Sequence, residues 1–210
     1  MKYILIILLT FLLMPKNLHA QLLLGFGGGY TIIPKNEGIS TNLIPNGESF
    51  NSPYIWISSP TTKDFSLFNI GLSVSGYVLE KWVSVYSNRI SLKWEIPQYN
   101  LFITYRTMLG IEKESPSLGI RAGGTYAPIT ISGEYQNYYG VEEYSDSEDK
   151  VGLYLGADII IPILKTNFSI FLVASKSFIK YEFLEDNVNL GSFTTGFGLP
   201  YTFYSNEEKY

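Results

Sequence analysis

Residues 151–162 of this 210-residue chain read VGLYLGADIIIP, and side chains of two kinds alternate along them. The odd-numbered positions from 153 to 161 hold leucine, alanine or isoleucine, whereas Gly152, Tyr154, Gly156 and Asp158 are mostly small or polar. Successive side chains of a β-strand point to opposite faces, so alternation of this kind predicts a strand with one apolar face.

The same alternation recurs at 68–75, 89–96, 118–123, 129–136 and 193–203. In a soluble β-protein, the solvent-exposed face of the sheet would be rich in lysine and glutamate. Here the second face carries mainly glycine, serine and threonine, which is typical of a narrow barrel lumen with lipid outside. We therefore expect the apolar series, including Leu92, Trp94, Ile129 and Ile131, to face lipid.

The composition favours the same class of protein. Charged residues make up only 16% of the chain and aromatic residues also 16%, whereas soluble domains carry about 25% charged residues. These features predict an all-β fold, an antiparallel transmembrane β-barrel, and a soluble periplasmic calycin-like ligand carrier is the rival all-β interpretation.

Residues 1–20 have the layout of a secretory signal peptide. Lys2 precedes an apolar run at 3–14, and a polar stretch at 15–20 ends in Ala20, after which we expect cleavage. The run is too short for a transmembrane helix, which needs about 20 apolar residues. The expected organisation is a signal peptide at 1–20, a barrel at 21–204 and a polar extension at 205–210, exported to the outer membrane of a Gram-negative bacterium.

The strand count follows less directly. Predicted strands lie at 22–33, 65–79, 83–96, 101–111, 117–126, 129–139, 151–162, 168–181 and 190–203. Bacterial single-chain barrels have even numbers of strands. We expect ten, counting 54–58 as another strand, with eight as the alternative. Tight turns are expected at Ala127-Pro128 and 163–167, and longer polar loops at 140–150 and 182–189.

Missing residue types exclude most chemistry. The chain has no cysteine, and its one histidine, His19, lies in the predicted signal peptide. The mature chain thus lacks thiolate and imidazole for catalysis or metal binding, so we predict no enzyme, no cofactor and no metal site. The net charge of −4 also argues against nucleic acid as a partner.

Three segments carry a family resemblance: LLLGFGGGYTII at 22–33, GIRAGGTYAPITISGEYQ at 119–136 and FTTGFGLPYTFY at 193–204. They resemble the small bacterial outer-membrane β-barrel superfamily, the opacity-protein and OmpA/OmpX-type barrels, without the peptidoglycan-binding domain of some relatives. The resemblance implies that Phe203 or Tyr204 is read by the barrel-assembly machinery. It transfers no active site.

Candidate residues fall into three groups. Charged residues predicted to line the lumen as an ion-pair network are Lys93, Glu95, Arg106, Arg121, Glu134 and Asp158. Small barrels are just wide enough for side chains to fill, so we interpret this network as a plug, with a gated pore as the alternative. Aromatic residues expected at the membrane interfaces are Trp82, Trp94, Tyr99, Tyr126, Tyr201 and Phe203. Tyr54 and Trp56 are candidate contact residues in a long first loop, 34–64.

The predicted function is a non-enzymatic outer-membrane barrel with a structural, adhesion or complex-forming role through external loops. Its expected partners are outer-membrane lipid and a protein bound by the long first loop. The alternative function is a small, porin-like diffusion channel, and the acidic segment 140–150 is interpreted as a solvated loop.

Overall fold

The computed structural model describes residues 22–36, 43–58, 68–85, 88–110, 115–183 and 186–203. Strands make up most of these residues, and none of the described residues forms a helix long and apolar enough to cross a membrane. The strands are β1 (Leu22–Ile32), β2 (Ser49–Ser58), β3 (Phe68–Val85), β4 (Asn88–Met108), β5 (Ser117–Asn137), β6 (Gly140–Pro162), β7 (Ser169–Phe178), β8 (Lys180–Phe183), β9 (Asp186–Asn189), β10 (Phe193–Gly198) and β11 (Tyr201–Phe203). The predicted signal peptide and C-terminal extension lie outside the described residues.

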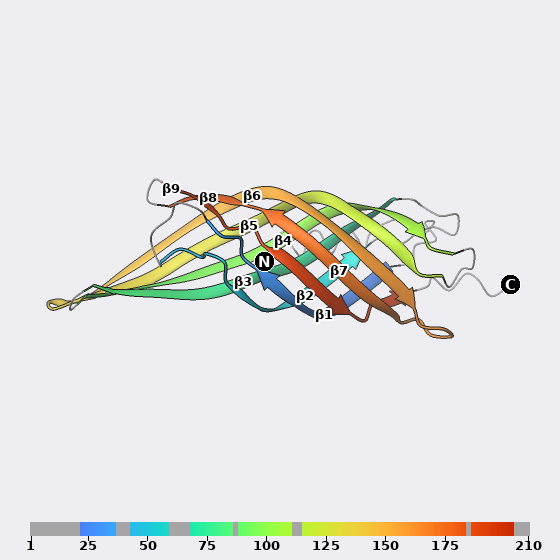
Figure 1. Cartoon of the computed structure of the whole chain (residues 1–210), viewed down its shortest axis with the longest axis horizontal. Helices are drawn as coiled ribbons and strands as arrows, with labels where there is room; N and C mark the ends of the chain where they lie inside the picture. Colours follow the sequence, from blue (N-terminus) through green and yellow to red (C-terminus); the bar gives the residue numbers. More distant parts are fainter. Residues whose placement is uncertain are drawn as a thin grey trace.

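The large sheet closes on itself. β1 to β7 pair in chain order, β10 pairs with β7, and β10 pairs back to β1 with antiparallel register. β11 resumes the last strand after Leu199 and Pro200 and also pairs with β1. The result is an eight-stranded antiparallel barrel (Figure 1). The expected ten strands were wrong, and the alternative of eight is confirmed.

The error in the count comes from two prolines. β4 runs unbroken through Pro97 and β5 through Pro128, so that four predicted strands form two long ones. Glu95 pairs with Thr130 and Tyr99 with Tyr126, which places Pro97 opposite Pro128 in a gap of that ladder. Each proline lacks a backbone N–H donor. Because the two prolines lie opposite each other, the missing backbone hydrogen bonds are confined to one short stretch of the ladder. The predicted turn at Ala127-Pro128 therefore does not exist.

The half of the barrel that contains the beginning of β1 and its partner β11 has an apolar outer surface. Phe68, Leu101, Ile120, Leu153 and Phe197 are each more than half exposed, as the alternation predicts. Inward positions of the same strands hold buried polar residues such as Asn100 and Thr125. An apolar exterior around a polar interior is the arrangement of a barrel wall immersed in lipid.

β3, β4, β5 and β6 continue well beyond this wall. They contain 18, 21, 21 and 23 residues, whereas a tilted strand needs only about 9–11 residues to span a bilayer. Their outer parts form a narrow four-stranded sheet that tapers toward one end of the molecule (Figure 1). We call this part, residues 75–85, 88–98, 127–137 and 140–150, the distal sheet.

The distal sheet reverses the chemistry of the wall. Its inward side holds Leu92, Trp94, Ile96, Ile129 and Ile131, all buried, so the prediction that these residues face lipid was wrong. The direction of alternation does not change along β4 or β5. What changes is the solvent around the outer face. Outside the bilayer this face meets water, so apolar side chains are stable only on the inward side of the sheet.

Candidate functional site

Three of the predicted lumenal charges meet inside the barrel. Asp158 of β6 lies between two arginines, with its Oδ2 2.5 Å from Nε of Arg121 on β5 and its Oδ1 2.6 Å from Nη2 of Arg106 on β4. The side chains of Asp158 and Arg121 are buried. Gly119 makes room for them, since a Cβ there would lie within 3 Å of both Arg106 and Asp158.

Aromatic side chains enclose the Arg121 guanidinium. Its Cζ lies 4.5 Å, 5.0 Å and 5.5 Å from the ring centres of Phe102, Phe171 and Trp56. Its Nη1 donates a hydrogen bond of 3.1 Å to the hydroxyl of Tyr54. One carboxylate serves two arginines here, and the negative faces of the rings help to stabilise the surplus positive charge. These groups fill the lumen at this depth.

Tyr54 and Trp56 therefore belong to the interior, and their prediction as loop contact residues was wrong. The segment predicted as one long loop contains β2, whose burial alternates regularly from Ser52 to Ser58. Trp56 packs 4.5 Å from Phe171, centre to centre. Burial rather than exposure explains why such large aromatic residues stand at alternate positions of this strand.

Lys93, Glu95 and Glu134 do not join the lumenal cluster. Lys93 pairs with Glu95 at 2.5 Å, but their side chains are 50% and 42% exposed on the outward side of the distal sheet. The hydrogen bond from Lys93 to Glu95 raises the pKa of the lysine. Glu134 is exposed on the same side. The predicted lumenal position of these three residues was wrong, because the side chains that alternate with them along β4 and β5, such as Leu92, Trp94 and Ile131, occupy the inward side.

Two carboxylates face each other on that outward side. Glu134 of β5 lies directly opposite Glu143 of β6, and like charges at such positions destabilise a sheet slightly. Both line a shallow groove of about 580 Å³ together with Glu80, Lys93 and Tyr144. The segment 140–150, predicted as a loop, is the first half of β6, so its acidic residues are held in an extended row.

The predicted interfacial aromatics lie in different environments. Trp94 is fully buried, so its prediction was wrong. Trp82 is exposed on the distal sheet, where the Arg89 guanidinium lies 5.5 Å from its ring, well past the apolar wall. Tyr99 and Tyr126 contact each other across β4 and β5, 6.2 Å between ring centres.

Tyr99 and Tyr126 lie where the apolar wall gives way to the distal sheet, a position that suits an interfacial role. At the other end of the wall, the ring of Tyr201 packs 5.1 Å from that of Phe168. The side chain of Phe203 lies outside the described part of the chain. The interfacial role of Tyr99, Tyr126 and Tyr201 stays a prediction.

An apolar core closes the barrel on the distal side. Residues on the inward face of the distal sheet pack against residues from the β1–β2 connection and from the segment between β7 and β10. This distal core consists of Ile33, Ile44, Tyr77, Leu92, Trp94, Ile96, Ala127, Ile129, Ile131, Ile179, Tyr181, Val188 and Leu190. The sequence signal for it was alternation extending far past a membrane-spanning length.

Specific hydrogen bonds fix the segments that cover the distal core. Nε1 of Trp94 donates to the carbonyl of Leu43 at 2.9 Å, and the Tyr77 hydroxyl donates to the carbonyl of Leu190 at 3.0 Å. The Asn36 side chain accepts from the backbone N–H of Asn189 at 2.7 Å. The covering segments are thus tied both to the sheet and to each other.

On the distal side, burial and the acidic residues of β6 shift the pKa values of titratable side chains. Burial and the nearby Asp146 carboxylate raise the pKa of Tyr181 to about 12, and the Tyr181 hydroxyl donates to Asp146 at 3.3 Å. Burial lowers the pKa of Lys81, whose ammonium pairs with Glu48. Within the described ranges, no group of three or more His, Cys, Asp or Glu side chains is arranged to hold a metal ion.

Solved structures with a similar backbone are outer-membrane proteins. The attachment invasion locus protein Ail of Yersinia pestis, solved in complex with the heparin analogue sucrose octasulfate, matches with a TM-score of 0.51 and 13% identity over 88% of this chain and 99% of that chain. Neisserial surface protein A matches with a TM-score of 0.51 and 9% identity, over 87% and 97% of the two chains. No protein family matches the sequence, and no curated protein does. At these identities the similarity establishes the fold, that of the small outer-membrane β-barrels.

Proposed function

We propose that this outer-membrane barrel is a non-enzymatic surface protein that acts by contact, in adhesion or complex formation, through its distal sheet. The observation that carries the proposal is the folded distal core, which gives the sheet a rigid support outside the bilayer. Longer connections of such barrels face the cell exterior, so the distal sheet is assigned to the cell surface.

The same features argue against a diffusion channel. At one depth the lumen is filled by Arg121 and the aromatic rings around it. On the distal side the lumen is covered by the distal core. Small barrels have little space left once side chains fill them. In planar-bilayer recordings we expect no stable open channel, and a reproducible single-channel conductance would contradict a contact role as the main function.

The acidic residues of the distal sheet favour a cationic partner. Glu80, Glu134 and Glu143 lie around the outer groove with one lysine, and further acids follow along β6. A cationic protein surface would relieve the repulsion between Glu134 and Glu143, whereas a polysulfated ligand of the kind bound to Ail would be repelled. At the sheet's tip, Tyr138 and Tyr139 are 89% and 94% exposed and offer aromatic anchors.

The test is co-purification from gently solubilised outer membranes with a double variant, Glu134→Gln with Glu143→Gln. A companion protein identified by mass spectrometry should be lost from this variant. The matched control, Glu142→Gln with Glu148→Gln, removes the same amount of charge at two positions of β6 whose parity is opposite to that of Glu143, and it should retain the companion. Equal recovery from both variants would place the contact elsewhere on the chain.

A further inference from the structure

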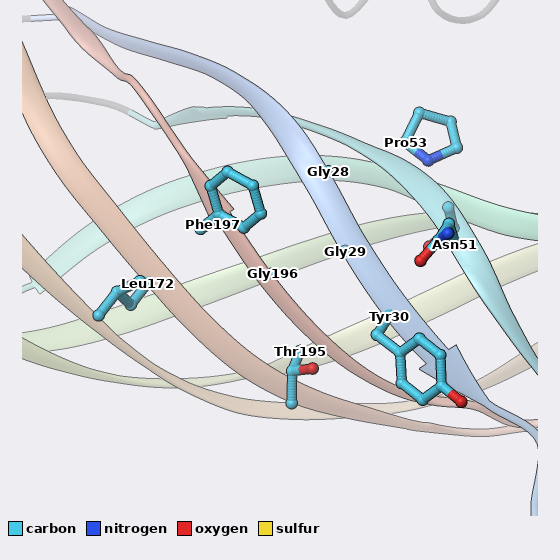
Figure 2. Close-up of a pocket in the computed structure, with 10 residues that line it drawn as sticks. Gly28, Gly29, Tyr30, Asn51, Pro53, Leu172, Thr195, Gly196 and Phe197 are labelled. Carbon is cyan, nitrogen blue, oxygen red and sulfur yellow. The ribbon is translucent and has the colours of Figure 1, made fainter.

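A groove of about 610 Å³ lies on the outer wall of the barrel, where β1, β2, β7 and β10 meet. Figure 2 shows it from outside, with Gly28 and Gly29 on the strand that crosses its centre and the side chains of Phe197, Leu172 and Pro53 around it. The groove faces away from the lumen, into the surface that contacts lipid.

The glycines of β1 have two different reasons to be glycine. Gly27 and Gly29 approach β10 closely, because a Cβ would lie 1.9 Å from the carbonyl oxygen of Phe197 at Gly27 and 2.7 Å from that of Thr195 at Gly29. At Gly28 a Cβ would meet no heavy atom within 4 Å. Packing inside the protein therefore does not require glycine at position 28, and its missing side chain is what leaves the groove open.

Large apolar side chains form the sides of the groove. Phe197 of β10 lies opposite Gly28 on one side and Pro53 of β2 lies opposite it on the other. Phe197 is 68% exposed and Leu172 44% exposed, so both present apolar surface to the hydrocarbon around the wall. Unfilled apolar space loses dispersion contacts along its lining, so an apolar chain is the occupant that suits this section.

The distal end of the groove is polar. Tyr30, Asn51 and Thr195 line it there, and the Tyr30 hydroxyl donates to Ser49. One step further toward the distal side, Lys176 lies opposite Phe193, with its ammonium 4.8 Å from the ring of Phe178. A lysine at the edge of an apolar wall extends its charge toward lipid headgroups.

We propose that this groove is a binding site for one acyl chain of an anionic, phosphate-bearing lipid in the leaflet on the distal side. The chain lies over Gly28 between Phe197 and Pro53, the ester region meets the polar groups of Tyr30, Asn51 and Thr195, and the phosphate lies toward Lys176. The order along β10 and β1, apolar first and then polar and cationic, is the order of groups along such a lipid.

The test is native mass spectrometry of the full barrel released from micelles supplemented with dimyristoyl phosphatidylglycerol. The wild-type chain should retain one lipid, and Gly28→Phe, which fills the groove, should lower that occupancy at least fivefold. The control is Ala122→Phe, which adds the same ring at an exposed outward position of β5, four strands away around the barrel. It should retain lipid like the wild type.

A further variant tests the headgroup. Lys176→Gln should remove the preference for phosphatidylglycerol over phosphatidylcholine while leaving chain binding intact. Folding is checked by the heat-dependent gel mobility of the barrel, and Gly28→Val serves as a smaller filling residue if the phenylalanine variant does not fold. Lipid retention unchanged in the folded Gly28 variants would overturn the proposal. So would a dimer in the wild type that these variants abolish, since the groove would then bind a second copy of the chain.

Discussion

The carboxylate of Asp158 accepts hydrogen bonds from Arg121 at 2.5 Å and from Arg106 at 2.6 Å, joining β4, β5 and β6 inside the barrel. Asp158→Asn leaves two guanidinium groups, which cannot lose their protons, without a counter-charge. Breaking a buried pair in this way costs about 3–5 kcal/mol. We expect that loss in the free energy of unfolding, measured with denaturant in lipid vesicles. Asp149→Asn, an exposed change on the same strand, should alter it by less than about 0.5 kcal/mol.

The seam between β1 and β10 should tolerate a methyl group on one side only. A Cβ at Gly27 would collide with the backbone of Phe197, whereas one at Gly28 enters open space. Gly27→Ala should therefore reduce the fraction of chains that close into a barrel, read from heat-dependent gel mobility after refolding. Gly28→Ala should fold like the wild type. Equal refolding of the two variants would mean that β1 and β10 lie further apart than described.

The distal core should unfold without the barrel. Trp94→Ala removes a buried ring and its hydrogen bond to Leu43, and deletions of this size cost about 3–5 kcal/mol. We expect new protease cleavage in the segment between β1 and β2 and between β7 and β10, while the membrane-embedded strands stay protected. Trp82→Ala, at an exposed position, should show the wild-type pattern. Loss of the whole barrel in Trp94→Ala would show that the two parts fold as one unit.

Tyr181 should make stability sensitive to alkaline pH. Burial and Asp146 raise its pKa to about 12 in the folded chain, compared with about 10 for a free tyrosine. The folded state thus holds this proton more tightly, and the stabilisation is complete below pH 10 and lost between about pH 10 and 12. The tyrosinate absorbance of the wild type minus that of Tyr181→Phe should rise near pH 12. A rise near pH 10 instead would indicate that Tyr181 is in contact with water.

The alternation at 151–162, its recurrence along the chain and the low charge content were enough to predict a membrane barrel, because lipid demands apolar side chains at every second position of a strand. The same rule misassigned Leu92, Trp94, Ile129 and Ile131, whose alternation is equally regular. Alternation separates two faces of a strand but does not say which solvent touches each face. That depends on how far along the strand the bilayer ends. On β4 and β5 the outward side chains change from apolar to polar where Pro97 lies opposite Pro128.

The candidate residues divide in the same way. Parity placed Arg121 and Asp158 correctly on the inward side, since direction alternates residue by residue and can be counted along the chain. It could not show that they meet each other and Arg106, or that Trp56 covers them, because depth in a barrel is set by the register of neighbouring strands. Register is set by pairing between strands across the closed sheet. Some of these pairs, such as Gly27 and Gly198, join residues far apart in the sequence, so the depth of each side chain depends on the whole barrel.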